Sequence, residues 1–192
     1  MITKTSTNYS AGSLISALLL SSMLSFTAIS AAYADGLPAN VQAKVDSYKK
    51  KITEWAADPV LVAAVKEANA KGPIAGMNNA KWSDLDEKDQ LAVSLQTSAA
   101  GKIVTELSKD PGISKLYLRD EHANLVASSN KALVYNNGTK PWITDPMKDG
   151  KAWSGKEIKP DPTTQIKGVH LSAPILSGGK PIGILHTSVV AE

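Results

Sequence analysis

Near the end of the chain stands VHLSAPI (Val169–Ile175), followed by SGGK (Ser177–Lys180) and IGILHTSV (Ile182–Val189). Two apolar runs separated by small, turn-forming residues predict a β-hairpin. Two more runs lie upstream, LYLRD (Leu116–Asp120) and NLVAS (Asn124–Ser128), and they predict a second hairpin. The last third of the chain therefore predicts a single antiparallel sheet of about five strands.

The first half carries apolar residues at steps of three and four, which predict amphipathic helices. The longest such run predicts one helix of about five turns from the positions Val41, Val45, Tyr48, Ile52 and Trp55. Asp58 before Pro59 predicts the start of a second helix, ending near Gly72, because aspartate caps helices and proline suits the first helical position. A third helix is expected from Ser83, as its cap, to about Leu107. The fold class is thus α+β, with a long N-terminal helix and further helices packed on the sheet.

From Ile113 onward the chain alternates with a period of two. This alternation predicts that Ile113, Lys115, Tyr117 and Arg119 share one face of a strand. Residues 130–164 predict a long irregular segment, and segments of this kind that carry aromatic anchors often form binding loops.

The N-terminal segment predicts a secretory signal. It has one charge, Lys4, then a stretch of apolar and small residues, and finally an A-x-A pattern at Ala32–Ala34. We expect residues 1–34 to be a signal peptide cleaved after Ala34, and residues 35–192 to be one domain in the periplasm. An uncleaved membrane anchor is the alternative, because the apolar stretch approaches the length of about 20 residues that spans a bilayer.

Composition excludes several functional classes. The chain has no cysteine, which removes disulfides, thiol catalysis and thiolate metal sites. Its net charge of +3 is too small to indicate a nucleic-acid partner.

Several motifs, taken in order, resemble those of the PDC or Cache family of extracytoplasmic sensor domains. They are the stretch from Trp55 through Asp58-Pro59 to Asn69, the hairpin Leu116–Ser128, and the Ile182-Gly183-Ile184 core of the last strand. The resemblance implies a PAS-like sheet behind a long N-terminal helix, and a homodimer through that helix. A glycine usually stands at the place of Asn124. Relatives usually continue into a membrane helix and an output domain, whereas this sequence ends at Glu192, so a stand-alone module is expected that reports to a membrane receptor or kinase.

Arg119 is the single arginine of the chain, and it follows Tyr117 on the same face of its strand. A guanidinium group binds a carboxylate through two parallel hydrogen bonds, which lysine cannot copy. We therefore expect Tyr117 and Arg119 to hold the charged end of a ligand. A salt bridge from Arg119 to Asp120 or Glu121 is the alternative interpretation.

Two histidines, His170 and His186, lie close to pairing distance across the last hairpin. With Ser172 they are expected to complete a polar pocket wall, and ordinary sheet histidines are the alternative. A metal site would need a third ligand, which His122 is not expected to supply, so neither a metal nor a cofactor is expected. Tyr135 and Trp142 are expected to line the apolar end of the pocket, or else to cap the sheet.

These observations predict a periplasmic module that binds a small organic ligand, a carboxylate or an amino acid, between the sheet and residues 130–164. The alternative is an interaction protein with no occupied pocket that docks on a membrane receptor. No pattern of nucleophile and base is present in the sequence, so an enzyme is not expected and no catalytic residue is assigned.

Overall fold

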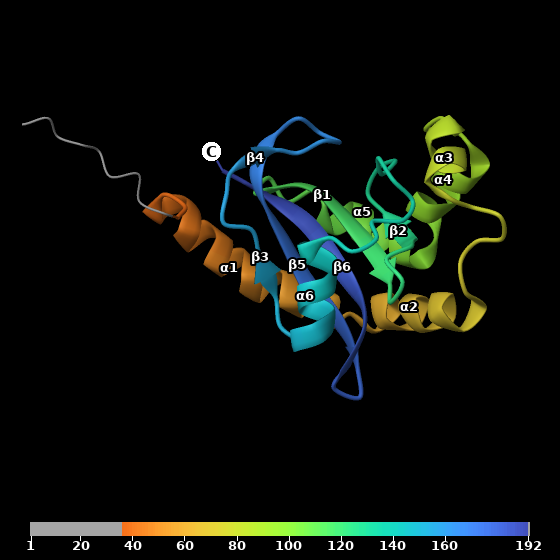
Figure 1. Cartoon of the computed structure of the whole chain (residues 1–192), viewed down its shortest axis with the longest axis horizontal. Helices are drawn as coiled ribbons and strands as arrows, with labels where there is room; N and C mark the ends of the chain where they lie inside the picture. Colours follow the sequence, from red (N-terminus) through yellow and green to blue (C-terminus); the bar gives the residue numbers. More distant parts are fainter. Residues whose placement is uncertain (1–35, 192) are drawn as a thin grey trace, which may run out of the picture. The chain divides into compact units, whose positions relative to one another are not determined.

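The computed structural model describes residues 36–191, which form an α+β fold (Figure 1). The expected signal peptide, residues 1–34, lies outside this range. The helices are α1 (Ala39–Ala56), α2 (Pro59–Lys71), α3 (Asn79–Asp84), α4 (Gln90–Thr97), α5 (Ala99–Leu107) and α6 (Pro141–Asp149). The strands are β1 (Ile113–Asp120), β2 (Leu125–Ser128), β3 (Trp153–Ser154), β4 (Lys159–Pro160), β5 (Lys167–Ser177) and β6 (Lys180–Val190).

The strands form one antiparallel sheet in the order β2-β1-β6-β5-β3, with β4 also pairing to β5. The last strand of the described residues, β6, therefore lies in the middle of the sheet. This confirms the α+β class and both predicted hairpins. The described range has six strands where about five were expected, because β3 and β4 are two-residue strands within the segment expected to be irregular.

The two faces of the sheet have different coverings (Figure 1). Helices α1, α2 and α5 pack on one face and bury the main apolar core with residues such as Ile52, Leu118 and Leu185. Helix α6 packs on the opposite face, against β5 and β6, and lies in front of them in Figure 1. Ile143 and Ile184 meet in a small apolar cluster beneath α6. Polar side chains on that second face are thus enclosed between the sheet and a covering segment.

The first two helices begin and end where the sequence predicts. Helix α1 buries Val41, Val45 and Ile52, which supports the three- and four-residue spacing. The Asp58 carboxylate accepts hydrogen bonds from the backbone N–H groups of Val60 and Leu61, so it caps α2 as expected.

The expected single helix from Ser83 to Leu107 is wrong. Ser83 lies inside α3, which Asn78 caps, and the chain bends again between α4 and α5. Ser98 adopts φ −55° and ψ 167°, which ends α4, and its hydroxyl caps α5 by accepting from the N–H of Gly101 at 2.9 Å. A Cβ on Gly101 would lie 2.4 Å from the Leu95 carbonyl oxygen, so glycine permits the tight corner between α4 and α5.

The prediction that Ile113 shares a strand face with Lys115, Tyr117 and Arg119 is also wrong. The pairing of β1 with β6 shifts between Ile113 and Leu116, which marks a β-bulge. An extra residue in a strand reverses which face the preceding side chains point to. Ile113 is therefore buried in the main core with Leu116, while Lys115 lies on the opposite face.

Residues 130–164 are more ordered than an irregular loop, since they contain α6, β3 and β4. Two glycines with positive φ, Gly138 at 54° and Gly150 at 64°, flank α6. Among residues 36–191, no helix is long and apolar enough to cross a membrane.

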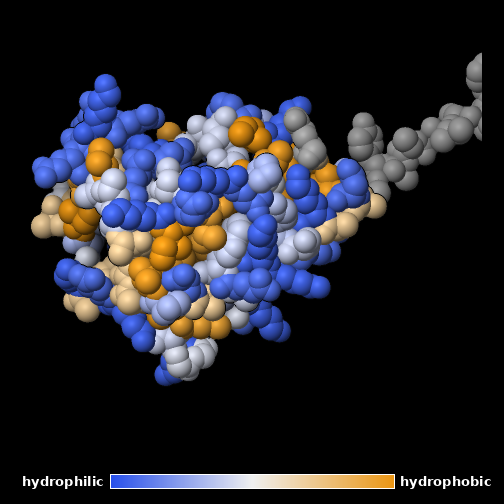
Figure 2. Space-filling model, turned by 180° about the vertical axis from the view of Figure 1, so that it is seen from behind, coloured by the Kyte–Doolittle hydropathy of each residue, from blue (hydrophilic) through white to orange (hydrophobic). Residues whose placement is uncertain are grey.

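Seen from behind, hydrophobic surface gathers near the middle of the described region, with hydrophilic side chains around it (Figure 2).

Candidate functional site

Polar side chains form a buried row across the middle of the sheet, on the face that α6 covers. The register places Tyr117 opposite His186, and His186 opposite Ser172. Tyr117, Ser172 and His186 are each at most 2% exposed. A sheet face that is covered by a helix usually carries apolar residues, because burial of polar groups costs free energy. A row of buried polar side chains therefore indicates a role in function.

The two histidines contact each other and lie beneath an indole ring. His186 shares hydrogen bonds with the Ser172 hydroxyl, through Nδ1 at 2.9 Å, and with Nδ1 of His170, through Nε2 at 3.3 Å. Trp142, from α6, stacks on both imidazoles with ring centroids 4.7 Å from His170 and 5.7 Å from His186. Burial, and next the charge of Lys115, lower the pKa of both histidines, that of His186 well below its usual value of 6.5. Both rings are therefore neutral near pH 7.

Arg119 uses both terminal nitrogens on backbone carbonyls. One donates to Ala123 at 2.9 Å and to Tyr135 at 2.7 Å, and the other donates to Val134 at 3.2 Å. Its Nε–H has no hydrogen-bond partner in the described part of the chain. Burial lowers the pKa of Arg119 to about 10, because charge is costly away from water.

The alternative interpretation of Arg119, a salt bridge to Asp120 or Glu121, does not occur among the described residues. The Asp120 carboxylate accepts instead from the backbone N–H groups of His122 and Asn124 and from the Asn124 side chain. Arg119 is thus a fully buried cation whose hydrogen bonds all go to neutral acceptors.

Two other donors on this face lack a partner. The indole N–H of Trp142 makes no hydrogen bond within residues 36–191. The Tyr117 hydroxyl lies beside Thr163 and Asn130 without a hydrogen bond of ordinary geometry, and burial raises its pKa to about 12. Together with the Arg119 Nε–H, these groups make the face rich in unused donors.

Lys115 and Asp161 form a buried ion pair that the sequence does not reveal. Burial lowers the pKa of Lys115, although Asp161 opposes this. Burial works against ionisation of Asp161, but Lys115 and the N–H groups of Thr163 and Thr164 hold its pKa below the usual range. The local signal for Asp161 is the sequence Asp-Pro-Thr-Thr, which is typical of an aspartate that caps a turn.

The structure brings six of the seven expected site residues onto one sheet face: Tyr117, Arg119, Trp142, His170, Ser172 and His186. Tyr135 differs, because its ring packs with Trp82 in an apolar cluster that reaches the polar face only through Tyr117, and its hydroxyl accepts from the N–H of Ile74. Tyr135 and Trp142 therefore do not form one apolar wall. Only the carbonyl of Tyr135 joins the polar face, through Arg119.

Within residues 36–191, no three His, Cys, Asp or Glu residues lie close enough together to hold a metal ion. What the face offers chemically is a set of hydrogen-bond donors around one buried cation, Arg119, that forms no ion pair with a described residue. Such a set suits an anion or a strong acceptor.

No family model matches this chain, and no curated protein matches it. Solved structures do match, at low identity. The sensor domain of the Vibrio cholerae histidine kinase DctB is 15% identical, with a TM-score of 0.40, over 79% of this chain and 57% of that chain. The ligand-binding domain of the Campylobacter jejuni chemoreceptor Tlp3, in complex with L-valine, is 17% identical, with a TM-score of 0.41, over 81% and 65%.

The extracellular domain of the putative histidine kinase rpHK1S-Z16 is 11% identical, with a TM-score of 0.41, over 78% of this chain and 59% of that chain. This chain thus spans less than two thirds of the length of each of these structures. By their names, these three structures are sensory, ligand-binding or extracellular domains.

Proposed function

We propose that this protein is a sensor module that binds a small organic anion, a carboxylate or an amino acid, against the polar face of its sheet. The observation that carries the proposal is the Arg119 guanidinium, buried without an anionic partner and with its Nε–H unused. An anion beside Nε would compensate this charge and would also accept from the Tyr117 hydroxyl and the Trp142 indole.

Access to this face requires movement of its cover. Trp142 belongs to α6, while Tyr117 lies beside Thr163 and Asn130 and Arg119 bonds to the loop that contains Tyr135. A ligand therefore has to displace α6 and its flanking loops. Gly138 and Gly150 occupy backbone conformations with positive φ on either side of α6, which makes them natural hinge points. Displacement of α6 is then the event that a membrane receptor or kinase partner reads.

Binding is favoured over catalysis. The hydrogen bond between Ser172 and His186 has the atoms of a nucleophile and base pair. The other ring nitrogen of His186 contacts His170, however, so no carboxylate of the described residues orients this imidazole as a catalytic base. We therefore assign this pair to the wall of the binding site, and the protein is a binding module with no catalytic step.

The chain is exported in this proposal. Cleavage after Ala34 releases residues 35–192 into the periplasm, and α1 forms the surface of a homodimer. N-terminal sequencing of the exported protein distinguishes cleavage from retention of residues 1–34 as an anchor.

The test is a thermal-shift screen against short carboxylates, amino acids, polyamines and purines, because a ligand that binds only the folded state raises its stability. A shift with one acidic class, followed by calorimetric titration, supports the proposal. Absence of any shift favours the second candidate, an interaction protein that docks on a receptor. The closed, fully packed state of the polar face is the observation that favours this second candidate.

Tyr117→Phe locates the site more cleanly than a change of Arg119, because Arg119 also holds three backbone carbonyls. Loss of the unpaired hydroxyl should weaken ligand binding by about 3- to 10-fold while the protein keeps its stability. Tyr48→Phe is the matched control, since its hydroxyl donates to Asp110 at 2.6 Å, far from the site. Unchanged affinity in Tyr117→Phe would move the ligand away from this face.

A further inference from the structure

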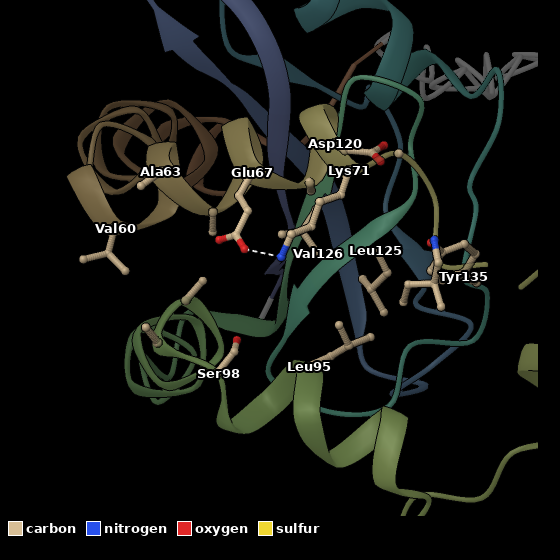
Figure 3. A pocket seen from close by; sticks show the side chains of 16 residues that line it. Val60, Ala63, Glu67, Lys71, Leu95, Ser98, Asp120, Leu125, Val126 and Tyr135 are labelled. Carbon is tan, nitrogen blue, oxygen red and sulfur yellow. Dashed lines mark hydrogen bonds and ion pairs between the residues drawn. The ribbon is translucent and has the colours of Figure 1, made fainter.

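A separate pocket of about 460 Å³ lies between α2 and the corner that joins α4 to α5 (Figure 3). Its deep side is formed by buried residues of α5, β2 and the loop that follows: Ala100, Leu125 and Tyr135. Its walls are mostly small residues of α2 and α5: Ala63, Ala64, Ala68, Ala99 and Ala100. The volume falls in the range of sites that hold small molecules, about 300–1,000 Å³.

The pocket stays open because contacts outside it hold α2 and α5 in place. The Asn69 side chain anchors α2 by donating to the Ile182 carbonyl at 2.7 Å and accepting from the N–H of Glu121 at 3.1 Å. The tight corner at Gly101 fixes the start of α5 against the end of α4. The alanine side chains between these helices are too short to fill the remaining space.

The charged residues of the lining are already paired or saturated. Glu67 and Lys71, one turn apart on α2, form an ion pair with each other (Figure 3), with side chains 64% and 72% exposed. The Asp120 carboxylate accepts three hydrogen bonds from its own turn. A charged ligand would therefore lose its hydration without gaining a free counter-charge.

Two hydroxyl groups in the lining retain a free proton. Tyr135 accepts from the N–H of Ile74 at 3.0 Å, so its own O–H is available to donate. The Ser98 oxygen accepts from Gly101 in the same way. We propose that this pocket binds a small uncharged molecule with an aliphatic or aromatic body and a hydroxyl or carbonyl oxygen. It is distinct from the proposed anion site, because Tyr117 and Arg119 take no part in its lining.

The test compares three probes that share one body and differ in charge: 1-octanol, octanoate and octylammonium. Each is titrated into the ¹⁵N-labelled chain and followed by NMR. Octanol should cause saturable shifts of the amides of Ala100, Leu125 and Tyr135, and should bind about tenfold more tightly than either charged probe. Binding of octanoate or octylammonium at equal strength would overturn the assignment to an uncharged ligand.

Ala68→Leu tests the location, because a leucine on this wall of α2 occupies the pocket. It should weaken octanol binding about tenfold or more, whereas Ala70→Leu, an exposed position on the same helix outside the lining, should leave it unchanged. Ala63→Leu at the exposed mouth replaces Ala68→Leu if that variant does not fold. The proposal would be refuted if octanol caused no saturable shift, or if the shifts lay elsewhere in the protein. It would also be refuted if the same amides shifted with protein concentration in the absence of a probe, because a second copy of the chain would then occupy the pocket.

Discussion

Lys115 in β1 and Asp161, just beyond β4, form an ion pair in which both side chains are buried. The pair joins a central strand to the segment that follows α6. Because Asp161 is 0% exposed and Lys115 is 5% exposed, neither charge can turn to water if the other is removed.

Asp161→Asn should therefore destabilise the fold by about 3–5 kcal/mol, since it leaves the Lys115 ammonium group buried without a counter-charge. Asparagine keeps the shape of the side chain and an oxygen that can still cap Thr163. Urea unfolding measures the loss. The double variant Lys115→Met with Asp161→Asn should recover part of it, and strictly additive losses would show that the two charges are not coupled.

Stability should fall as the pH drops below about 6.5, the usual pKa of histidine. Burial lowers the pKa of His170 and His186, so the unfolded chain binds protons in a range where the folded chain does not. Their contribution is fully present above pH 6.5 and declines by up to about 1.4 kcal/mol per pH unit for each histidine, until the folded-state pKa values are reached.

Urea unfolding at about pH 7.5 and about pH 5.5 measures this difference. His186→Gln should reduce it, whatever the variant does to stability at the higher pH. His122→Gln changes an exposed histidine in a turn and should leave the difference in place. An identical pH profile in His186→Gln would contradict the assignment.

Gly183→Ala should destabilise the protein by about 1–3 kcal/mol or more. A Cβ at Gly183 would lie 2.3 Å from the Arg119 carbonyl oxygen and 2.7 Å from a Val65 methyl group, so β1 or α2 would have to move. Gly155→Ala is the control at the β3 edge of the sheet, because the nearest neighbours of a Cβ there lie at 3.7 Å. Thermal unfolding should separate the two variants, and equal melting temperatures would argue against the close approach of β1 and β6 at this point.

Asn69→Ala should cost about 1–3 kcal/mol, because it removes two hydrogen bonds and leaves the part-buried Ile182 carbonyl without its donor. Gln42→Ala removes an exposed side-chain hydrogen bond to Asp46 and should be close to neutral. In hydrogen-exchange measurements, the backbone amides of α2 should exchange faster in Asn69→Ala and should not change in Gln42→Ala. Protection that stays the same would mean that Asn69 does not anchor this helix.

Local sequence patterns predict those parts of the fold that local chemistry decides. The Asp58 cap, the spacing from Val41 to Ile52 and the Gly178-Gly179 turn each act over a few residues, and the structure has all three. The break at Ser98 is missed although its signal is local, since Ser98 caps α5 and Gly101 follows it. The bulge after Ile113 depends on how β1 pairs with the distant strand β6.

The candidate site shows the same division. Alternation along β1 predicts that Tyr117 and Arg119 share a face, and hairpin pairing predicts that His170 approaches His186. The Lys115–Asp161 pair escapes the sequence because the two residues are far apart along the chain. The three carbonyls around Arg119 escape it because they depend on the path of the loop that contains Tyr135.

The central place of β6 constrains how the protein can fold. Strand β1 pairs with β6 from Ile113 opposite Val189 to Asp120 opposite Gly183, so the β1–β2 hairpin cannot join the rest of the sheet until residues 180–190 are available. Pairing of such distant segments slows folding, because loop entropy is lost before the contacts form. A chain emerging from a ribosome or a translocation channel therefore holds its helices and first hairpin without a completed sheet until residues 180–190 have emerged.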